Sequence, residues 1–205
     1  MLKKQEEFKI YSKEKIRLEL SNKDIKDTNK LISEELLDKN FDELIYIFKY
    51  EGLIRKLILD YKFNEKSYLY LSFANFILND KKIIEKIKKY DKIIPVPISK
   101  ARFKQRGYNQ TDLIATKIAK ETKMELLNNC LIKTKNIIEQ SKLNKEDREQ
   151  NIQGAYILQN KELIENQKIL LMDDIYTTGN TANECCKTLL QGNPKTIGVF
   201  TIAKD

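Results

Sequence analysis

Residues 168–184, KILLMDDIYTTGNTANE, are the stretch that decides the fold. They open with an apolar run of strand length that ends in two carboxylates, Asp173 and Asp174. A Thr-Thr-Gly-Asn-Thr turn at 177–181 follows, and residues 180–192 then predict a helix. A buried strand, a polar turn and a helix in this order indicate one unit of a parallel α/β sheet.

The same alternation extends outward from this stretch. Strands are predicted at 44–50, 91–98, 127–135, 154–158, 168–175 and 196–203. Helices are predicted at 53–63, 66–78, 109–123 and 180–192, and residues 80–90 predict a further helix or an extension of the second. A short helix is predicted at 27–44, and a hairpin or short strands at 8–20. Because strands and helices alternate from residue 91 onward, we expect an α/β fold whose parallel sheet is covered by helices on both faces.

Composition excludes several kinds of chemistry. The chain has 205 residues and no histidine, so Ser-His-Asp and Cys-His catalysis and His-ligated metals are ruled out. Its three cysteines, Cys130, Cys185 and Cys186, fit neither a disulfide framework nor a zinc site and are interpreted as buried thiols. Mean hydropathy is −0.54, and no apolar run approaches the ~20 residues of a membrane span, so we expect a soluble, cytoplasmic protein.

The net charge of +8 is concentrated in one segment. Residues 51–110 hold fourteen basic and six acidic side chains, whereas the other segments together cancel. Such an excess is typical of a surface that attracts phosphate, in a small ligand or in nucleic acid. Solvated lysine-rich helix faces, as in KKIIEKIKKY at 81–90, explain the same count without any ligand.

The chemistry of the 168–184 stretch is specific. Ligands of parallel sheets bind where strands hand over to loops, and Gly179 lets the backbone approach a ligand there. The amides of the turn and of the following helix favour an anion, and the threonine hydroxyls add donors. Two acids beside a phosphate suit vicinal hydroxyls or a magnesium shell, which is the layout of a ribose 5-phosphate. The spacing matches neither a Walker P-loop nor a GxGxxG turn. The alternative to a ligand site is a purely structural role, in which the turn caps the helix and the two acids are exposed at the sheet edge.

These residues resemble the phosphoribosyl pyrophosphate (PRPP) motif of type I phosphoribosyltransferases, and the chain more narrowly resembles the competence protein F (ComF) family. Three further segments are similar to that family's pattern over roughly residues 44–205: YEGLIRKLILDYKF (50–63), IIPVPISKARFKQRGYNQTDLIA (93–115) and EQSKLNKEDREQNIQGAY (139–156). The resemblance implies the type I phosphoribosyltransferase fold, with PRPP and Mg²⁺ as ligands and a nitrogen nucleophile that displaces pyrophosphate.

The resemblance also implies roles for individual residues. Asp173 and Asp174 would hold the ribose hydroxyls, directly or through water and Mg²⁺. The 5-phosphate would be cradled by Thr177, Thr178, Gly179, Asn180 and Thr181. The loop that would approach the pyrophosphate comprises Ile98, Ser99, Lys100 and Ala101, with positive charge from Arg102, Lys104 and Arg106.

A long polar connector, 136–153, would be the mobile part that closes over the site, and its Gln140 and Arg148 are candidates for ligand contact. Arg106, Gln140 and Arg148 are the candidate catalytic residues. Simpler interpretations stay open. Arg102 and Lys104 could be solvated, Gln140 could be an ordinary loop residue, and Asn109 could cap the helix that follows it.

The chain departs from the family at its N-terminus. Members commonly begin with a four-cysteine zinc module, but residues 1–43 contain no cysteine, so we expect no zinc and a small α/β or helical segment in its place. The remainder, 44–205, is then a phosphoribosyltransferase-like domain with a hood-like part at 44–90 and a core at 91–205.

Two functions from different classes remain. The first is an enzyme that transfers phosphoribosyl from PRPP to an unknown nitrogen acceptor. The second is a non-catalytic competence or DNA-uptake factor that binds single-stranded DNA or a partner ATPase, with the fold as scaffold or ligand sensor. Aromatic residues interleaved with the basic segment suit stacking on bases, although most lie at helical spacing and are expected in the core. A magnesium phosphatase or receiver domain would need a differently spaced set of acids.

Overall fold

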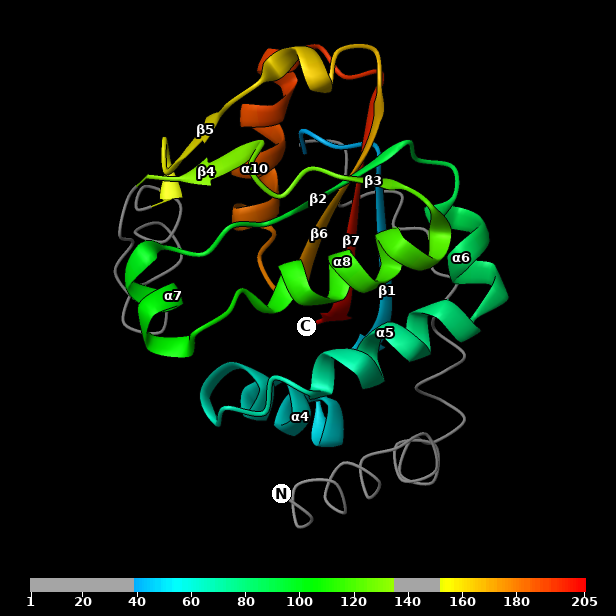
Figure 1. Ribbon diagram of the computed structural model, residues 1–205, viewed down its shortest axis with the longest axis vertical. Coiled ribbons are helices and arrows are strands. Elements are labelled where there is room, and N and C mark those ends of the chain that lie inside the picture. Colours follow the sequence, from blue (N-terminus) through cyan, green and yellow to red (C-terminus); the bar gives the residue numbers. More distant parts are fainter. Residues whose placement is uncertain (1–38, 135–151) are drawn as a thin grey trace.

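The computed structural model of the chain describes residues 39–134 and 152–205. In chain order its elements are β1 (Glu43–Lys49), α4 (Gly52–Phe63), α5 (Leu69–Asn79), α6 (Lys81–Ile87), β2 (Lys92–Pro95), α7 (Lys100–Arg106), α8 (Gln110–Thr122), β3 (Glu125–Leu126), β4 (Leu131–Lys133), β5 (Tyr156–Leu158), η3 (Lys161–Leu163), β6 (Lys168–Tyr176), α10 (Asn180–Leu189), η4 (Leu190–Gly192) and β7 (Thr196–Lys204). Five strands form one parallel sheet in the order β1-β7-β6-β2-β3 (Figure 1).

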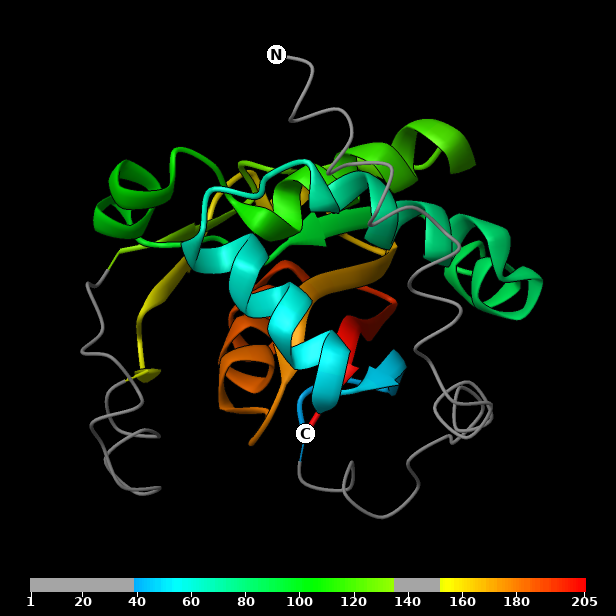
Figure 2. The same cartoon turned by 90° about the horizontal axis from the view of Figure 1, so that it is seen from below.

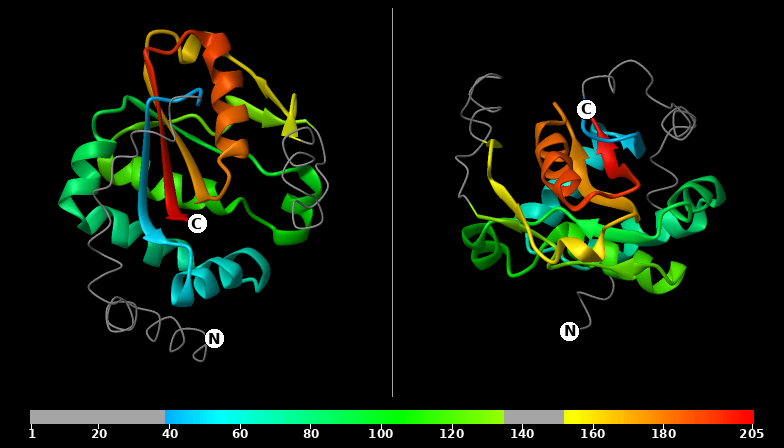
Figure 3. Two further views of the ribbon diagram at one scale, coloured as in Figure 1. Left: turned by 180° about the vertical axis from the view of Figure 1, so that it is seen from behind. Right: turned by 90° about the horizontal axis from the view of Figure 1, so that it is seen from above.

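Helices cover both faces of this sheet, as the sequence predicts. On one face, α4, α5, α6 and α8 share a core cluster with the sheet. On the other face lies α10, with β4 and β5 beside it (Figures 2 and 3). Strand β6 explains why both faces are apolar: Ile169 and Leu171 belong to the α10 side, and the alternate residues Leu170 and Met172 to the opposite side. This parallel α/β arrangement is the one that the resemblance to type I phosphoribosyltransferases implies.

Most of the predicted elements are present. The strands at 44–50, 91–98, 154–158, 168–175 and 196–203 correspond to β1, β2, β5, β6 and β7, and the helices at 53–63, 66–78 and 109–123 to α4, α5 and α8. The helix predicted at 80–90 is separate from the second helix and ends earlier, at Ile87. The one predicted at 180–192 ends at Leu189 and continues as the 3-10 turn η4. The three cysteines are buried free thiols, as expected.

The strand predicted at 127–135 is confirmed only for Leu131–Lys133, which form β4 and pair antiparallel with β5 in a separate two-stranded sheet. The two-residue strand β3 lies before the predicted range and pairs with β2 in the main sheet. Hydrogen bonding explains the division, because Leu127 N still bonds to the carbonyl of Ile93, whereas Gln159 N bonds to that of Cys130. The segment from Glu125 to Lys133 therefore leaves the main sheet and joins the two-stranded one.

Helix α7 was not predicted. It lies where the sequence indicates only a loop, and none of its residues is buried, so it shows no apolar period. It begins at the cap Ser99, whose Oγ accepts from the Arg102 amide at 3.3 Å, and it ends at Gly107 in the left-handed region (φ +76°).

The N-terminal predictions lie almost wholly outside the described residues. Of the helix predicted at 27–44, only residues 39–44 are described, and they form a bend and the start of β1. Strand β1 pairs with β7 at one edge of the main sheet, so the segment 44–90 contributes a strand to the sheet as well as helices. Within the described ranges, no helix is long and apolar enough to cross a membrane.

Candidate functional site

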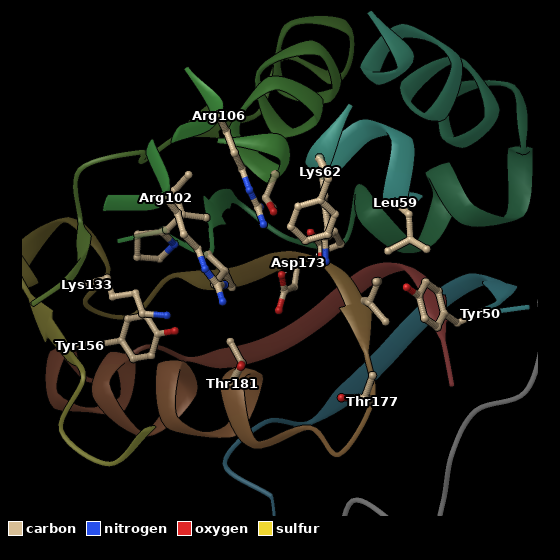
Figure 4. A pocket seen from close by; sticks show the side chains of 17 residues that line it. Tyr50, Leu59, Lys62, Arg102, Arg106, Lys133, Tyr156, Asp173, Thr177 and Thr181 are labelled. Carbon is tan, nitrogen blue, oxygen red and sulfur yellow. Dashed lines mark hydrogen bonds and ion pairs between the residues drawn. The ribbon is translucent and has the colours of Figure 1, made fainter. Parts of the chain in front are cut away.

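A cavity of about 390 Å³ opens at the carboxyl edge of the main sheet, where the parallel strands end and the loops begin. Its walls come from five parts of the chain: the end of β1 and α4, the segment after β2, α7 with the start of α8, the β4-β5 pair, and the β6-α10 junction. The lining residues are Tyr50, Leu59, Lys62, Phe63, Val96, Pro97, Ile98, Arg102, Arg106, Thr111, Lys133, Tyr156, Asp173, Asp174, Ile175, Thr177 and Thr181 (Figure 4).

The two acids lie near the end of β6 and have different partners. The Asp174 amide donates to Asp173 Oδ1 at 2.8 Å, and Asp174 Oδ1 accepts from Lys62 Nζ of α4 at 2.9 Å. Burial, and after it the charge of Asp174, raise the pKa of Asp173 to about 7, while Lys62 and Lys133 act against the rise. The pair thus offers carboxylate oxygens to hydroxyl donors at the cavity floor, with one oxygen already held by an ammonium.

The turn after β6 forms a small recess that adjoins this cavity. Residues 173 and 175–182 line it, and Thr177 and Thr181 also line the main cavity. Gly179 has a left-handed backbone (φ +75°) at the N-cap of α10, and no side chain caps that helix. The first amides of α10 are therefore available to an anion, with threonine hydroxyls beside them.

Cations from two other elements face the same cavity. Arg102 and Arg106 come from α7, and Lys133 comes from β4, where its Nζ lies 5.2 Å from the centre of the Tyr156 ring. Burial lowers the pKa of Lys133, and the charge of Arg102 lowers it further. Among the described residues, neither Arg102 nor Lys133 has a carboxylate within ion-pair distance. Two such cations on one wall are stabilised when an anionic ligand is present.

The structure brings most of the predicted site residues together. Those that line the main cavity are Arg102, Arg106, Asp173, Asp174, Thr177 and Thr181. Those that line only the recess are Thr178, Gly179 and Asn180.

The remaining predicted residues are placed differently. Ser99 is buried and caps α7, and neither it nor Lys100 nor Ala101 lines the cavity, although Ile98 just before them does. Gln140 and Arg148 lie outside the described residues.

The lining residues that were missed from the sequence include Lys62, Lys133 and Tyr156. A signal for Lys62 existed, because it shares a helical face with Leu59 and Phe63 that differs from the core face of α4. No comparable signal marked Lys133 or Tyr156, since both reach the cavity through the long-range pairing of β4 with β5, where they are direct partners.

The RGYNQ segment (106–110) fastens α4 to this wall of the cavity. The Tyr61 hydroxyl donates to the Gln110 carbonyl at 2.7 Å, the Tyr108 hydroxyl donates to the Tyr61 carbonyl, and the two rings stack. Asn109 caps α8 through the Thr111 amide and donates from Nδ2 to the Val96 carbonyl at 3.0 Å. The capping role considered for Asn109 is therefore confirmed.

Comparison with known proteins agrees with this geometry. The phosphoribosyl transferase domain family matches residues 114–205, which include the acidic pair and the turn. Competence protein F of Haemophilus influenzae is 30% identical over 82% of this chain and 75% of its own length. Competence protein ComFC of Streptococcus pneumoniae is 28% identical over 77% of this chain and 66% of its own. A DNA utilization protein of Shigella flexneri is 23% identical over 80% of this chain and 73% of its own.

The match to competence protein F spans most of both chains, and the matched domain contains the acid-and-turn motif on which the cavity is built. The chain therefore belongs to the ComF family, within the phosphoribosyltransferase superfamily.

Proposed function

We propose that this protein binds PRPP with Mg²⁺ in the carboxyl-edge cavity and transfers the phosphoribosyl group to a nitrogen acceptor. The observation that carries the proposal is a convergence. One cavity holds an acidic pair suited to hydroxyls, a turn suited to a phosphate, and two cations, Arg102 and Lys133, that have no carboxylate within ion-pair distance among the described residues. PRPP carries the three complementary groups in one molecule: ribose hydroxyls, a 5-phosphate and a pyrophosphate.

The arrangement supports a position for each part of the ligand. The 5-phosphate would lie in the recess at the start of α10, on the open amides and on the hydroxyls of Thr177 and Thr181. The ribose hydroxyls would donate to Asp173 and Asp174. The pyrophosphate would lie toward Arg102 and Lys133, which Figure 4 shows on the opposite side of the cavity from Tyr50 and Leu59.

Catalysis in this site would be mainly electrostatic. When the bond between ribose C1 and pyrophosphate breaks, negative charge gathers on the leaving group, and Arg102, Arg106 and Lys133 are already placed on that wall. The acidic pair would orient the ribose while positive charge develops at C1. Neither role calls for a histidine, which the chain lacks.

The residues present fit a magnesium ion held jointly with the substrate. Within the described ranges, no group of three acidic or thiol side chains could hold a metal alone. Mg²⁺ commonly binds through one or two carboxylates together with substrate phosphates and water, and Asp173 and Asp174 supply such a pair. When bound, the ion would neutralise charge on the pyrophosphate. Lys62 holds one oxygen of Asp174, so it would compete with the ion or a hydroxyl there.

Calorimetric titration of PRPP, with and without Mg²⁺, tests the proposal. We expect metal-dependent micromolar binding that is lost in the double variant Asp173→Asn/Asp174→Asn. Glu125→Gln serves as control, because that carboxylate is exposed and pairs with Lys92 outside the cavity. Folded wild-type protein that takes up no PRPP at millimolar concentration would refute the proposal.

The relatives named for competence and DNA utilization support the same biological process for this chain. A second candidate, single-stranded DNA binding, is favoured by two exposed aromatic side chains near the cations of α7: Phe63 (56% exposed) and Phe103 (54%). Other aromatics of the basic segment, Tyr61 and Phe73, are buried in the core, as expected. DNA binding would weaken steeply with salt, whereas PRPP binding would depend more on metal. A partner ATPase and a cytoplasmic location remain predictions.

A further inference from the structure

Strands β4 and β5 contribute one cross-strand pair of side chains to the cavity. Lys133 and Tyr156 are direct partners in the antiparallel register, and both line the cavity. The Lys133 ammonium lies 5.2 Å from the centre of the Tyr156 ring. That ring belongs to the core cluster on the α10 side of the sheet, so packing holds the pair in place from behind.

The hydroxyl of Tyr156 is a buried polar group that the fold does not use. Tyr156 is only 4% exposed, and its hydroxyl has no hydrogen-bond partner among the described residues. The hydroxyls of Tyr61 and Tyr90, in contrast, donate to a carbonyl and to a carboxylate. A phenylalanine would fill the same space without burying an unpaired polar group, so the hydroxyl lowers the stability of the free protein.

The groups around this hydroxyl leave its proton without a strong acceptor. Arg102 and Lys133 are donors only, and the buried Cys185 thiol, whose pKa is raised by burial, is neutral and a weak partner. The charge of Asp173 acts on the hydroxyl without a hydrogen bond between the two side chains. Burial raises the pKa of Tyr156 well above its ordinary value, so the hydroxyl keeps its proton at neutral pH and is available as a donor.

The direction of the side chain identifies the acceptor that suits it. Figure 4 shows the hydroxyl end of Tyr156 directed from β5 toward the middle of the cavity, on the side where Arg102 and Lys133 lie. This is the wall on which the pyrophosphate would be held. Its phosphoryl oxygens would be negatively charged acceptors beside a buried donor that has no other partner in the described part of the chain.

We propose that the Tyr156 hydroxyl donates a hydrogen bond to a phosphoryl oxygen of pyrophosphate, and that Tyr156 with Lys133 selects a diphosphate over a single phosphate. The inference rests on the proposed function. A hydrogen bond from a neutral hydroxyl to an anionic oxygen is among the stronger ones, and it would satisfy a group that is unpaired in the free protein. The hydroxyl thus lowers the stability of the free protein and raises its affinity for the ligand.

The experiment uses the full chain and the variant Tyr156→Phe, which removes the hydroxyl and keeps the ring beside Lys133. Calorimetry with Mg²⁺ measures the Kd of inorganic pyrophosphate and of ribose 5-phosphate, and urea unfolding measures the midpoint. We expect the pyrophosphate Kd to rise roughly tenfold and the ribose 5-phosphate Kd to stay within about twofold. The urea midpoint should equal or exceed that of the wild type.

Two control variants separate a ligand contact from a structural role. Thr201 is fully buried, its hydroxyl also has no partner within the described ranges, and it does not line the cavity although it is the register partner of Asp173. Thr201→Val should therefore leave both Kd values within about twofold. Tyr61→Phe removes a hydroxyl that donates to the Gln110 carbonyl at 2.7 Å, so it should lower the urea midpoint.

Each contrary result rejects a definite part of the reasoning. A urea midpoint that falls in Tyr156→Phe as it does in Tyr61→Phe would show a structural hydroxyl and overturn the inference. An equal rise in both Kd values would place the hydroxyl at the 5-phosphate, and an equal rise in Thr201→Val would assign the effect to packing; either outcome contradicts the proposal.

Failure of the proposed function is distinguishable from failure of this inference. Wild-type protein that binds PRPP, with a pyrophosphate Kd unchanged in Tyr156→Phe, would leave the proposed PRPP site standing and reject the role of Tyr156. Wild-type protein that binds neither PRPP nor pyrophosphate would refute the proposed function and this inference together, and the titration of the wild type alone reports that result.

Discussion

Replacing Gly179 by alanine should destabilise the protein, because the added methyl group would collide with the side chain of Tyr176. Gly179 has φ +75° and begins the turn into α10. A Cβ built there would lie 2.5 Å from Tyr176 Cζ and closer still to the hydroxyl. The Tyr176 ring is buried and packs edge-on against Phe41, with ring centres 6.4 Å apart, so it cannot move aside without losing that contact.

The magnitude follows from two separate costs. A left-handed backbone costs a residue with a Cβ roughly 1–2 kcal/mol, and forcing extra volume against a packed ring costs roughly 1–3 kcal/mol. The sum is roughly 2–5 kcal/mol for Gly179→Ala. Gly107→Ala is a matched control, because Gly107 has φ +76° and no atom within 4 Å of the added Cβ. It should cost only the backbone part, roughly 1–2 kcal/mol.

Urea unfolding of the three proteins measures both values from the shift in midpoint at constant m. The difference between the two variants, roughly 1–3 kcal/mol, isolates the contact with Tyr176. Equal destabilisation of the two variants would refute the reasoning, since only the left-handed backbone would then matter. Gly179→Ala should also weaken PRPP binding at least tenfold, because the displaced turn carries the amides proposed to hold the 5-phosphate.

Three further predictions concern side chains of the cavity. Asp173→Asn/Asp174→Asn should abolish PRPP binding yet retain the far-UV circular dichroism of the wild type, because the amides preserve shape and lose charge; unchanged affinity would reject the assigned site. Arg106→Ala should weaken PRPP or pyrophosphate binding roughly tenfold, as expected for a charged hydrogen bond, and Lys195→Ala should not; equal calorimetric effects would mean that the basic region is only surface. Lys133→Gln should lower pyrophosphate affinity by a similar factor and leave ribose 5-phosphate affinity within about twofold, and equal losses for the two ligands would place Lys133 elsewhere.

The sheet and the motif at its edge could be predicted because their signals are local. The alternation of Ile169 and Leu171 with Leu170 and Met172 is apolar on both faces, which requires a strand covered on both sides. Asp173, Asp174 and the glycine turn follow directly, so the carboxyl edge is identified within one continuous segment. The acids and the turn are neighbours in the sequence, so the chemistry of that edge can be inferred without knowing any long-range contact.

Helix α7 and the β4-β5 pair could not be predicted, for two different physical reasons. Helix α7 buries no residue, so it leaves no periodic apolar pattern, and its Ser99 cap and Gly107 end are the only local signals of its limits. Strand β4 has three residues, and its partner Tyr156–Leu158 lies more than twenty positions later in the chain. Pairing over that distance is decided by tertiary packing, which no local propensity expresses.

The basic segment shows why a charge count locates a site only coarsely. Of the fourteen basic side chains in 51–110, three line the cavity: Lys62, Arg102 and Arg106. The lysines of α6 contribute to the same count without reaching the cavity, which fits the solvated-face interpretation of 81–90. Lys133, in contrast, lies outside the segment and yet lines the cavity, where burial lowers the pKa of its ammonium. The field at the cavity is therefore set by a few cations that folding brings from three elements, not by the excess charge of one segment.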